Sequence, residues 1–446
     1  MESRDRAVVL GGSIAGLLAA RVLADSYRSV VIVERDRLST TGQRRGVPQG
    51  EHVHGLLPRG RQIMEDLLPG LVEDLVAAGA HDGDILDNVR WYVSGRMLRQ
   101  VPTGLLALSA SRPLIEGAIR ARVTALPNVT VLDGYDAVGL STSPDRRRVT
   151  AARVTSVGGE VSRILPADLV VDATGRGSRA ARWVADLGLG PVPEDRVGID
   201  LTYSSRVFQG PADLFGDDIV VATMRHPGQK RSAVMQRLEG GRVLVTLAGI
   251  LGERPPGDLD GFIAYASTLA APDTYHVARA GRPIGDASRY RIPTYVRRRY
   301  ERLAEPPAGL LVVGDALCFF NPVYGQGMSV AAMNAACLRD ELGHGGGVPD
   351  PTRFFAAVAP TVDAPWAIGV GADLAVAGVT GPVLPASPLT GEYVETLRQA
   401  AVEDAALAAA FVRVTSLVDP PPALLRPEIV DRVARRADAV VIVSTR

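Results

Sequence analysis

The segment that decides the fold is Ala7-Val8-Val9-Leu10-Gly11-Gly12-Ser13-Ile14-Ala15-Gly16, near the start of a chain of 446 residues. Its apolar half predicts a buried strand, and its glycine-rich half predicts a tight turn into a helix. Gly11 permits the turn, and Gly16 lets the helix pack closely against the strand. Ser13 stands where this pattern has its middle glycine, and its side chain leaves slightly less room for a phosphate.

A second strand over residues 29–33 ends at Glu34. This spacing is typical of a Rossmann-type site that binds the ADP moiety of a dinucleotide. The helix N-terminus would face the pyrophosphate, and Glu34 would accept a hydrogen bond from a ribose hydroxyl. The alternative interpretation is a tight strand-to-helix turn that binds no ligand.

Two later segments indicate a flavin in particular. Residues 167–175 read as an apolar strand that ends in Ala-Thr-Gly. Residues 309–328 place a buried strand before Asp315, and a glycine-rich turn follows at Asn321-Pro322-Val323-Tyr324-Gly325-Gln326-Gly327-Met328. Asp315 can accept a hydrogen bond from a ribityl hydroxyl. The helix predicted over about 328–342 offers free N–H groups to an anion or an electron-rich ring edge.

These three ordered motifs resemble the FAD-dependent monooxygenases with the para-hydroxybenzoate hydroxylase fold, and the resemblance runs through most of residues 5–375. Residues 44–54 and 321–327 look most like the squalene-epoxidase-like branch, which includes bacterial epoxidases that act on polyene precursors of polyethers. The resemblance implies an α/β protein. A Rossmann-type FAD-binding domain would carry an inserted antiparallel-sheet substrate domain and be followed by a helical C-terminal region.

We expect a discontinuous FAD-binding domain over residues 1–190 and 289–345. The substrate-binding β-sheet domain would cover 191–288, and the helical region would cover 346–446. Local patterns predict a helical stretch over 59–79 that breaks at Pro69-Gly70. They also predict a helix around Phe354 that is followed by Pro360, one apolar-rich helix over 390–418 and another over 428–437. The last two helices would cap the core or form a dimer contact.

The resemblance also implies roles for individual residues. The loop pattern leaves open which of Arg44 and Arg45 points inward, and Arg45 is assigned to the flavin ring. The residues expected to bind FAD are Gly11, Gly12, Ser13, Ala15, Gly16, Glu34, Arg35, Arg45, Arg112, Gly175, Gly314, Asp315, Pro322, Gly325, Gly327 and Met328. The residues expected at the reacting edge of the ring are Pro322, Gly325, Gln326, Gly327 and Arg45. Phe320, Tyr203 and Met235 are expected to line the substrate pocket.

The family's chemistry supplies the expected reaction. Reduced flavin and oxygen would form a C4a-hydroperoxide, whose distal oxygen is inserted into the substrate. We expect epoxidation of an alkene, or hydroxylation, in a small hydrophobic natural-product intermediate. NADPH or NADH would supply the electrons, either directly or through a separate flavin reductase.

Three other reactions remain open: aromatic hydroxylation, flavin-dependent reduction of a double bond, and a non-redox cyclisation that uses FAD as a scaffold. Halogenation is disfavoured because the sequence lacks the motifs to which flavin-dependent halogenases look, a lysine beside the substrate and a Trp-x-Trp sequence. The sole lysine is Lys230 in a polar loop, and Trp91, Trp183 and Trp366 are isolated, so the chain has no Trp-x-Trp sequence.

Composition narrows the class of protein further. The 49 basic and 49 acidic residues balance, which argues against a nucleic-acid partner or a basic membrane patch. The sequence has no run of about 18 apolar residues, so no membrane span is predicted. The two cysteines, Cys318 and Cys337, form no Cys-x-x-Cys motif. Glu51 precedes His52 and His54, but these histidines lack a nearby set of Asp, Glu or Cys residues with a known ligand spacing, so no metal is expected. We expect a soluble cytoplasmic protein that acts alone or as a homodimer.

Overall fold

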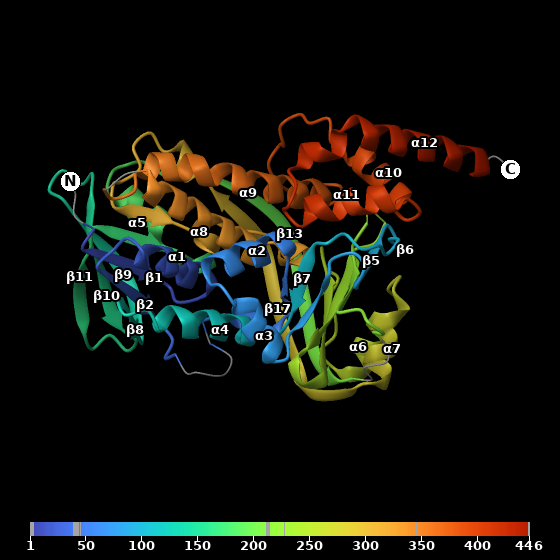
Figure 1. Ribbon diagram of the computed structural model, residues 1–446, viewed down its shortest axis with the longest axis horizontal. Coiled ribbons are helices and arrows are strands. Elements are labelled where there is room, and N and C mark those ends of the chain that lie inside the picture. The colour runs from blue at the N-terminus through green and yellow to red at the C-terminus, as the bar shows by residue number, and fades with distance from the viewer. Residues whose placement is uncertain are drawn as a thin grey trace.

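The computed structural model describes residues 4–38, 44, 46–210, 215–226, 228–344 and 347–444, with side chains described up to residue 436. The chain folds as a mixed α/β protein with one parallel sheet, several antiparallel sheets and C-terminal helices (Figure 1). The structure therefore has the α/β fold class that the sequence predicts.

A five-stranded parallel sheet carries the glycine-rich turn. Its strands are β1 (Arg6–Leu10), β2 (Ser29–Glu34), β8 (Val129–Asp133), β12 (Leu169–Asp172) and β18 (Leu310–Val312), in the order β18-β12-β1-β2-β8. Residues 7–10 of β1 and all of β12 and β18 are buried, as expected for a parallel sheet that is covered on both faces. Because the strands are parallel, the three predicted motifs follow carboxyl ends at one edge of the sheet.

Helices cover this sheet. They are α1 (Ile14–Ala24), α2 (Pro58–Leu67), α3 (Leu71–Ala77), α4 (Arg112–Thr124), α5 (Ala180–Asp186) and α8 (Gly327–Gly343). Helix α1 packs against α4 and α8. Gly70 adopts a φ of 81° between α2 and α3, so the helix break predicted at Pro69-Gly70 is confirmed. This conformation is open to glycine at little cost.

The chain also forms two three-stranded antiparallel sheets, of which the first lies beside the parallel sheet and the second contacts α2 and the eight-stranded sheet. One is the meander of β9 (Tyr135–Thr142), β10 (Val149–Ser156) and β11 (Ser162–Pro166). The other contains β3 (Gly55–Leu56), β7 (Leu106–Ser109) and β4 (His81–Asp84).

The largest sheet that the structure describes has eight strands in the order β19-β17-β13-β16-β15-β14-β5-β6. Its strands are β5 (Val89–Val93), β6 (Arg96–Met97), β13 (Glu194–Gln209), β14 (Val220–Thr223), β15 (Arg231–Leu238), β16 (Arg242–Gly249), β17 (Arg282–Arg298) and β19 (Cys318–Phe319). Helices α6 (Leu259–Ala266) and α7 (Pro272–Ala280) pack on one face around Phe208, Phe215 and Phe262.

This sheet extends beyond the expected range of 191–288. Strands β5 and β6 join it from earlier in the chain, and the boundary expected at residue 288 falls inside β17. Pro283 and Pro293 make this segment look unlike a strand. Strand β19 pairs only with Val296 and Arg297. Most of β17 therefore lies at a sheet edge, where a proline removes no ladder hydrogen bond.

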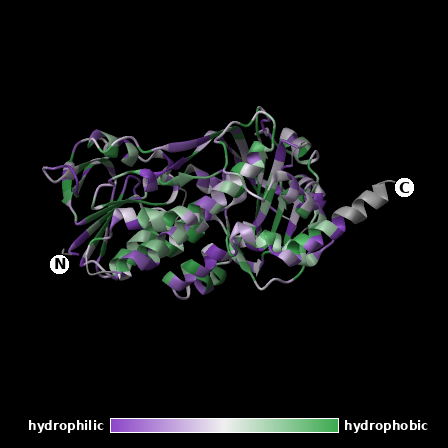
Figure 2. Cartoon of the chain, turned by 90° about the horizontal axis from the view of Figure 1, so that it is seen from above, coloured by the Kyte–Doolittle hydropathy of each residue, from purple (hydrophilic) through white to green (hydrophobic). Residues whose placement is uncertain are grey.

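Helix α9 (Pro351–Leu374) continues through Pro360 and Pro365. Its residues Phe354, Val358 and Trp366 are buried, and the helix packs against α8, so tertiary packing outweighs the helix-breaking effect of the prolines. Within the described ranges, α9 has a length and composition that would also allow it to cross a membrane. Figure 2 views the molecule from above and shows helices with many hydrophobic residues, drawn in green.

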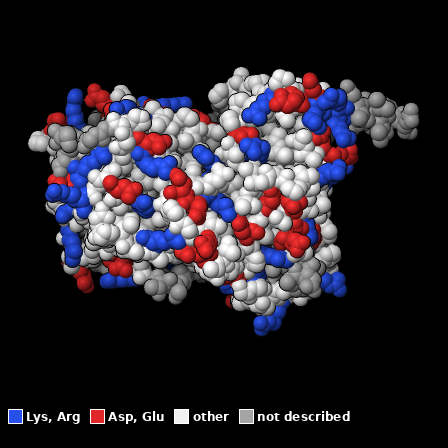
Figure 3. Space-filling model, in the orientation of Figure 1, with Lys and Arg blue, Asp and Glu red and all other residues white. Residues whose placement is uncertain are grey.

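The C-terminal region contains α10 (Gly391–Ala401), α11 (Ala405–Thr415) and α12 (Pro427–Ser444). The single helix predicted over 390–418 is divided because Asp404 accepts hydrogen bonds from the backbone N–H groups of Ala406 and Leu407, which caps α11. Residues of α10 and α11 share a core with Val89 and Ile219, so these helices pack against the eight-stranded sheet. Helix α12 packs against α10 and α11 (Figure 1), and its residues Ile429 and Val433 are buried in the same core. The face in Figure 3 carries charges of both signs interspersed.

Candidate cofactor and substrate site

One cavity of about 950 Å³ joins the glycine-rich turn to the eight-stranded sheet. Gly11, Glu34 and Arg112 line one part of it, and Trp91 and Tyr203 line another. The elements that carry the three predicted motifs therefore open into the same space as the sheet residues. A cofactor held at the turn and a substrate held at the sheet would lie in one continuous cavity.

The glycine-rich turn has the close backbone approaches that the sequence predicts. Gly11 has a φ of 99°, and a Cβ atom there would lie 2.4 Å from the Ala173 carbonyl oxygen. A Cβ atom at Gly16 would lie 1.8 Å from the Gly11 carbonyl oxygen. The Gly12 N–H donates to Glu34 Oε2 at 2.8 Å, which fixes the carboxylate at the end of β2. Only glycine fits at Gly11 and Gly16 without displacing backbone atoms.

The first turn of α1 is left without a side-chain cap. Ser13 is the N-cap residue, but its hydroxyl donates to Glu116 Oε2 at 2.7 Å instead of accepting from the helix. The Nε atom of Arg112 is buried without a partner beside this turn. Free N–H groups at a helix start and a buried guanidinium form a suitable place for the pyrophosphate of FAD.

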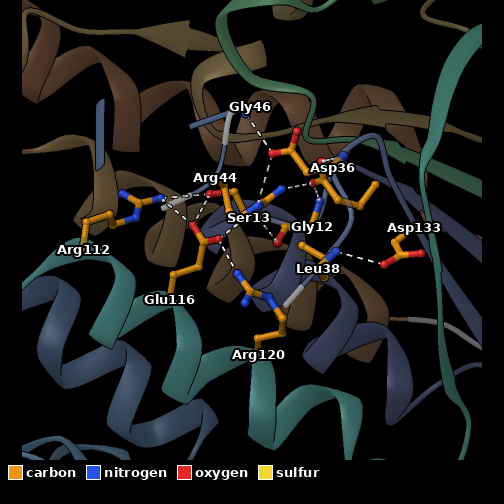
Figure 4. A network of polar contacts seen from close by, with 11 residues as sticks. Gly12, Ser13, Asp36, Leu38, Arg44, Gly46, Arg112, Glu116, Arg120 and Asp133 are labelled. Carbon is orange, nitrogen blue, oxygen red and sulfur yellow. Dashed lines mark hydrogen bonds and ion pairs between the residues drawn. The ribbon is translucent and has the colours of Figure 1, made fainter. Parts of the chain in front are cut away.

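Glu116 lies at the centre of a network of arginines (Figure 4). Its Oε1 accepts from Arg44 and from Arg120 at 2.6 Å each, and its Oε2 lies 3.4 Å from Arg112. Arg44 also pairs with Glu34 at 2.5 Å. Burial alone would raise the pKa of Glu116, but Arg112 and Arg44 hold it below its usual range. Glu116 and Arg44 were not among the predicted site residues, although Arg112, Glu116 and Arg120 share a helix face by their spacing of four.

Asp315 lies on the turn that follows β18 and lines the cavity. Desolvation raises the pKa of its carboxyl group to about 6, although Arg112 and Arg176 favour the charged form. A carboxyl group that is costly to ionise gains from hydrogen-bonding partners, such as the ribityl hydroxyls of a flavin.

The turn at residues 321–328 leads into α8. Asn321 Oδ1 accepts from the Val323 N–H at 3.1 Å, and Gly325 has a φ of 67°. Gln326 is buried, and its Nε2 donates to the Thr415 carbonyl oxygen at 3.2 Å. The turn that is predicted to hold the flavin edge is therefore tied to the C-terminal helix α11.

His52 lies between the aromatic rings of Tyr203 and Tyr290, with centroids at 5.5 and 5.8 Å. Its Nδ1 is 2.7 Å from the Ser205 hydroxyl, which is 2.6 Å from the Thr246 hydroxyl. Burial lowers the pKa of His52 to about 4, so the ring is neutral at neutral pH. Desolvation likewise lowers the pKa of His54 to about 3. Among the described residues, no group of three or more His, Cys, Asp or Glu side chains could hold a metal ion.

A second buried network ties the C-terminal end of α9 to the cavity wall. Asp373 is fully buried and pairs with Arg225. It also accepts from Tyr295 at 2.7 Å, Tyr324 at 2.8 Å and Asn321 at 2.9 Å. Arg225 and Asp373 are 148 residues apart, and no local pattern in the sequence pointed to either.

The structure gathers most of the predicted site residues around the cavity. Those that line it are Gly11, Ser13, Ala15, Glu34, Arg35, Arg112, Gly175, Gly314, Asp315, Pro322, Gly325, Gln326, Gly327, Met328, Phe320 and Tyr203. Gly12 and Gly16 lie behind this surface and shape the turn. Arg45 lies outside the described residues, whereas Arg44 lines the cavity.

The structure does not place Met235 in the substrate pocket. Its side chain is fully buried in the core formed with Phe208 and Phe262, under α6 and α7. Successive side chains of a strand point to opposite faces of the sheet. Its neighbours Val234 and Gln236 line the cavity instead.

The comparisons with known proteins agree with this architecture. No protein-family model matches the chain. Protein Rv3254 of Mycobacterium tuberculosis is 36% identical to it over 356 residues, which cover 76% of this chain and 73% of the relative.

Solved structures of low sequence identity share the fold. The flavin-dependent brominase Bmp2 has a TM-score of 0.66 at 15% identity, covering 93% of this chain and 94% of its own. A mutant of 2-methyl-3-hydroxypyridine-5-carboxylic acid oxygenase has a TM-score of 0.61 at 19% identity, covering 82% and 90%. The Diels-Alderase PyrE3 has a TM-score of 0.63 at 17% identity, covering 93% and 81%. The chain belongs to the family of Protein Rv3254 and has the fold of the flavin-dependent monooxygenases.

Proposed function

We propose that this protein is a FAD-dependent monooxygenase that inserts one oxygen atom from O2 into a hydrophobic natural-product intermediate. The observation that carries the proposal is the continuity of the cavity between the glycine-rich turn and the eight-stranded sheet. A cofactor that activates oxygen must lie next to the substrate and away from bulk water. The fold shared with a flavin-dependent brominase and an oxygenase supports the same class of reaction.

The residues present fit FAD. The uncapped start of α1 and the orphaned Nε of Arg112 suit the pyrophosphate, and Glu34 suits the ribose. Asp315 suits the ribityl chain, and the start of α8 at Gly327 suits the pyrimidine edge of the ring. When it is bound, FAD supplies the activation of oxygen. The protein supplies orientation, N–H groups and the exclusion of water.

The part of the cavity beside the sheet has an apolar wall. Trp91, Met224 and Ile292 come from the sheet or its edges, Phe320 precedes the flavin turn, and Leu384 follows α9. Such a wall favours a hydrophobic substrate that is held by a few polar contacts. We therefore propose an alkene as the reacting group and epoxidation as the reaction, in keeping with the resemblance to the squalene-epoxidase-like branch. Aromatic hydroxylation is the alternative oxygenation.

The electrons would come from NADPH or NADH, either directly or through a separate flavin reductase. A reductase of double bonds would use the same donor and would consume no oxygen, so oxygen uptake separates it from the monooxygenase.

A second candidate is a non-redox cyclase. A Diels-Alderase shares the fold over 93% of this chain, so a flavoenzyme scaffold of this shape also serves cyclisation. In this case FAD would be a structural element of the cavity wall, and turnover would leave both oxygen and the flavin redox state unchanged.

The test is a stopped-flow experiment on the FAD-loaded protein after anaerobic reduction. The reduced protein is mixed with oxygenated buffer, with and without candidate polyenes and phenols, and the flavin absorbance is followed. Reoxidation in resolved phases, with the isotopic label of O2 found in the product, would support the proposal. Failure to bind FAD, or product that forms without oxygen uptake, would rule it out.

A further inference from the structure

We propose that Arg225 and Tyr203 form an anion subsite in the cavity, so that the substrate is a hydrophobic molecule with one carboxylate or similar oxyanion. This inference rests on the proposed function, because it names a property of the substrate of the same site.

The first observation is a set of buried donors that have no acceptor among the described residues. The Arg225 side chain is 5% exposed, and within the described part of the chain its Nη2 alone has a partner, which is Asp373. Its Nε and Nη1 atoms are buried without a hydrogen bond, and so is the hydroxyl group of Tyr203. A guanidinium carries five N–H donors, and three of them belong to these two nitrogens. Leaving buried donors unpaired is unfavourable, so these groups are suited to bind an acceptor.

The second observation is that Arg225 and Tyr203 both line the cavity. Burial raises the pKa of Tyr203 well above its usual range, and the positive charge of Arg225 opposes that rise, as it does for Tyr324. Arg225 Nη2 and the Tyr324 hydroxyl both donate to Asp373 Oδ1, so the guanidinium and this phenol group meet at one carboxylate. An anion that enters there would meet a buried cation and a hydroxyl donor together.

A second arginine adds positive charge to the same region. Arg398 of α10 lines the cavity, its Nε is also buried without a partner, and its charge acts on Tyr324. Among the described residues, the ion pair of Arg398 is with Glu395, whose carboxylate lies 3.9 Å from Nη1, too far for a hydrogen bond. Asp373 balances the charge of Arg225, and the charge of Arg398 is only weakly balanced.

The Asp373 network makes this subsite rigid. Asp373 accepts four hydrogen bonds or ion pairs, from Arg225, Tyr295, Asn321 and Tyr324. The carboxylate therefore holds Arg225 in one orientation before a substrate arrives. A charged group that is fixed in advance loses little conformational entropy when it binds a ligand. The alternative is that Arg225 only neutralises Asp373 and meets no ligand.

Matched acids and amides test the proposal on the FAD-loaded protein. Naphthoate is compared with naphthamide, and decanoate with decanamide, by isothermal titration calorimetry at neutral pH. Each pair has nearly the same size and differs in charge. At least one acid is expected to bind at least about tenfold more tightly than its amide, because a charge-assisted hydrogen bond is stronger than a neutral one. Acids that bind no tighter than their amides, including no binding of any of the four compounds, would overturn the proposal.

The double variant Arg225→Gln/Asp373→Asn removes both charges and leaves neither one buried alone. Its acid-to-amide preference is expected to fall to about one, with the amide affinity unchanged. Arg231→Gln is the control, because Arg231 pairs with Glu253 and does not line the cavity. Arg398→Gln leaves the Arg225–Asp373 pair intact, and is the second variant if the double variant does not fold. An acid preference that stays at the wild-type value in the variants that fold would overturn the proposal.

This experiment is independent of the test of the monooxygenase. Binding of the acids is measured without turnover, and FAD loading is followed separately by absorbance. A protein that binds the acids but leaves oxygen unchanged would lose the proposed reaction and keep the anion subsite. A protein that oxygenates substrates but shows no acid preference would keep the reaction and lose the subsite.

Discussion

Arg44 Nη1 donates to Glu116 Oε1 at 2.6 Å, deep beside the glycine-rich turn. The side chains of Arg44 and Glu116 are 9% and 3% exposed, so this ion pair is shielded from water. Because Glu116 also binds Ser13 and Arg120, it links α4 to the start of α1. A single carboxylate thus positions the arginines that face the proposed pyrophosphate.

Substitution of Glu116 should be costly because it leaves buried cations without a partner. We expect Glu116→Gln to lower the free energy of unfolding by about 3 kcal/mol, as loss of one partner of a buried pair does. Asp74→Asn is the control. Asp74 lies on α3 with its side chain 60% exposed, and it pairs with Arg122, which lies on the same helix as Glu116. That change should cost less than about 1 kcal/mol. Urea denaturation of the two variants measures the difference, and equal losses would contradict the central role of Glu116.

Two glycines with positive φ should respond differently to alanine. At Gly325 an added Cβ meets no atom within 4 Å, so Gly325→Ala should cost about 1–2 kcal/mol from backbone strain alone. At Gly11 the same atom would lie 2.4 Å from the Ala173 carbonyl, so Gly11→Ala should cost more than about 3 kcal/mol and weaken FAD binding. Thermal unfolding and FAD titration compare them. A Gly11 variant as stable as the Gly325 variant would show that the turn can relax.

Asp315 should make the FAD-free protein less stable as the pH rises. Desolvation raises the pKa of Asp315 to about 6 in the folded protein, above its value in the unfolded chain. Ionisation therefore costs folding free energy as the pH rises from about 4 to about 6. We expect Asp315→Asn to be more stable than the wild type by about 2–3 kcal/mol at pH 7 and not at pH 4. Denaturation at the two pH values checks the sign, and a gain that is the same at both would argue against this cause.

His52 should have the opposite pH dependence. Burial lowers the pKa of His52 to about 4, so the unfolded chain binds its proton first as the pH falls below about 6.5. The wild type should lose up to about 3 kcal/mol of stability between pH 6.5 and 4 from this residue. His52→Gln should show a shallower loss over the same window. A parallel pH profile for the two proteins would exclude His52 as the source.

What the sequence predicted best are strands and turns, which are local features of the chain. Gly11, Glu34 and Asp315 follow strands that are visible as apolar runs, and strict parallel topology brings their ends to one edge. The sequence could not show β17, because Pro283 and Pro293 resemble strand breakers until their place at a sheet edge is known. The sequence could not show which face of β15 Met235 lies on, because both faces of this strand mix apolar and polar residues.

The long-range polar pairs were beyond the reach of sequence reasoning. Arg225 and Asp373 come from different parts of the chain and meet only after α9 packs against the eight-stranded sheet. Glu116 is different, because its spacing from Arg112 and Arg120 was visible. That spacing is also common on exposed helices, so burial was needed to show its importance.

The hydrogen bond from Gln326 to the Thr415 carbonyl joins the proposed flavin turn to α11, and Phe411 and Val414 of that helix line the cavity. The half of the cavity proposed to hold the cofactor is lined mainly by the first half of the chain and by residues 314–328. Residues between 384 and 424 line the other end of the cavity. Substitutions in this C-terminal segment can therefore reshape the far end of the cavity while the glycine-rich turn stays intact. Under the proposed function, relatives could diversify their substrates by varying one end of the chain while the cofactor site stays constant.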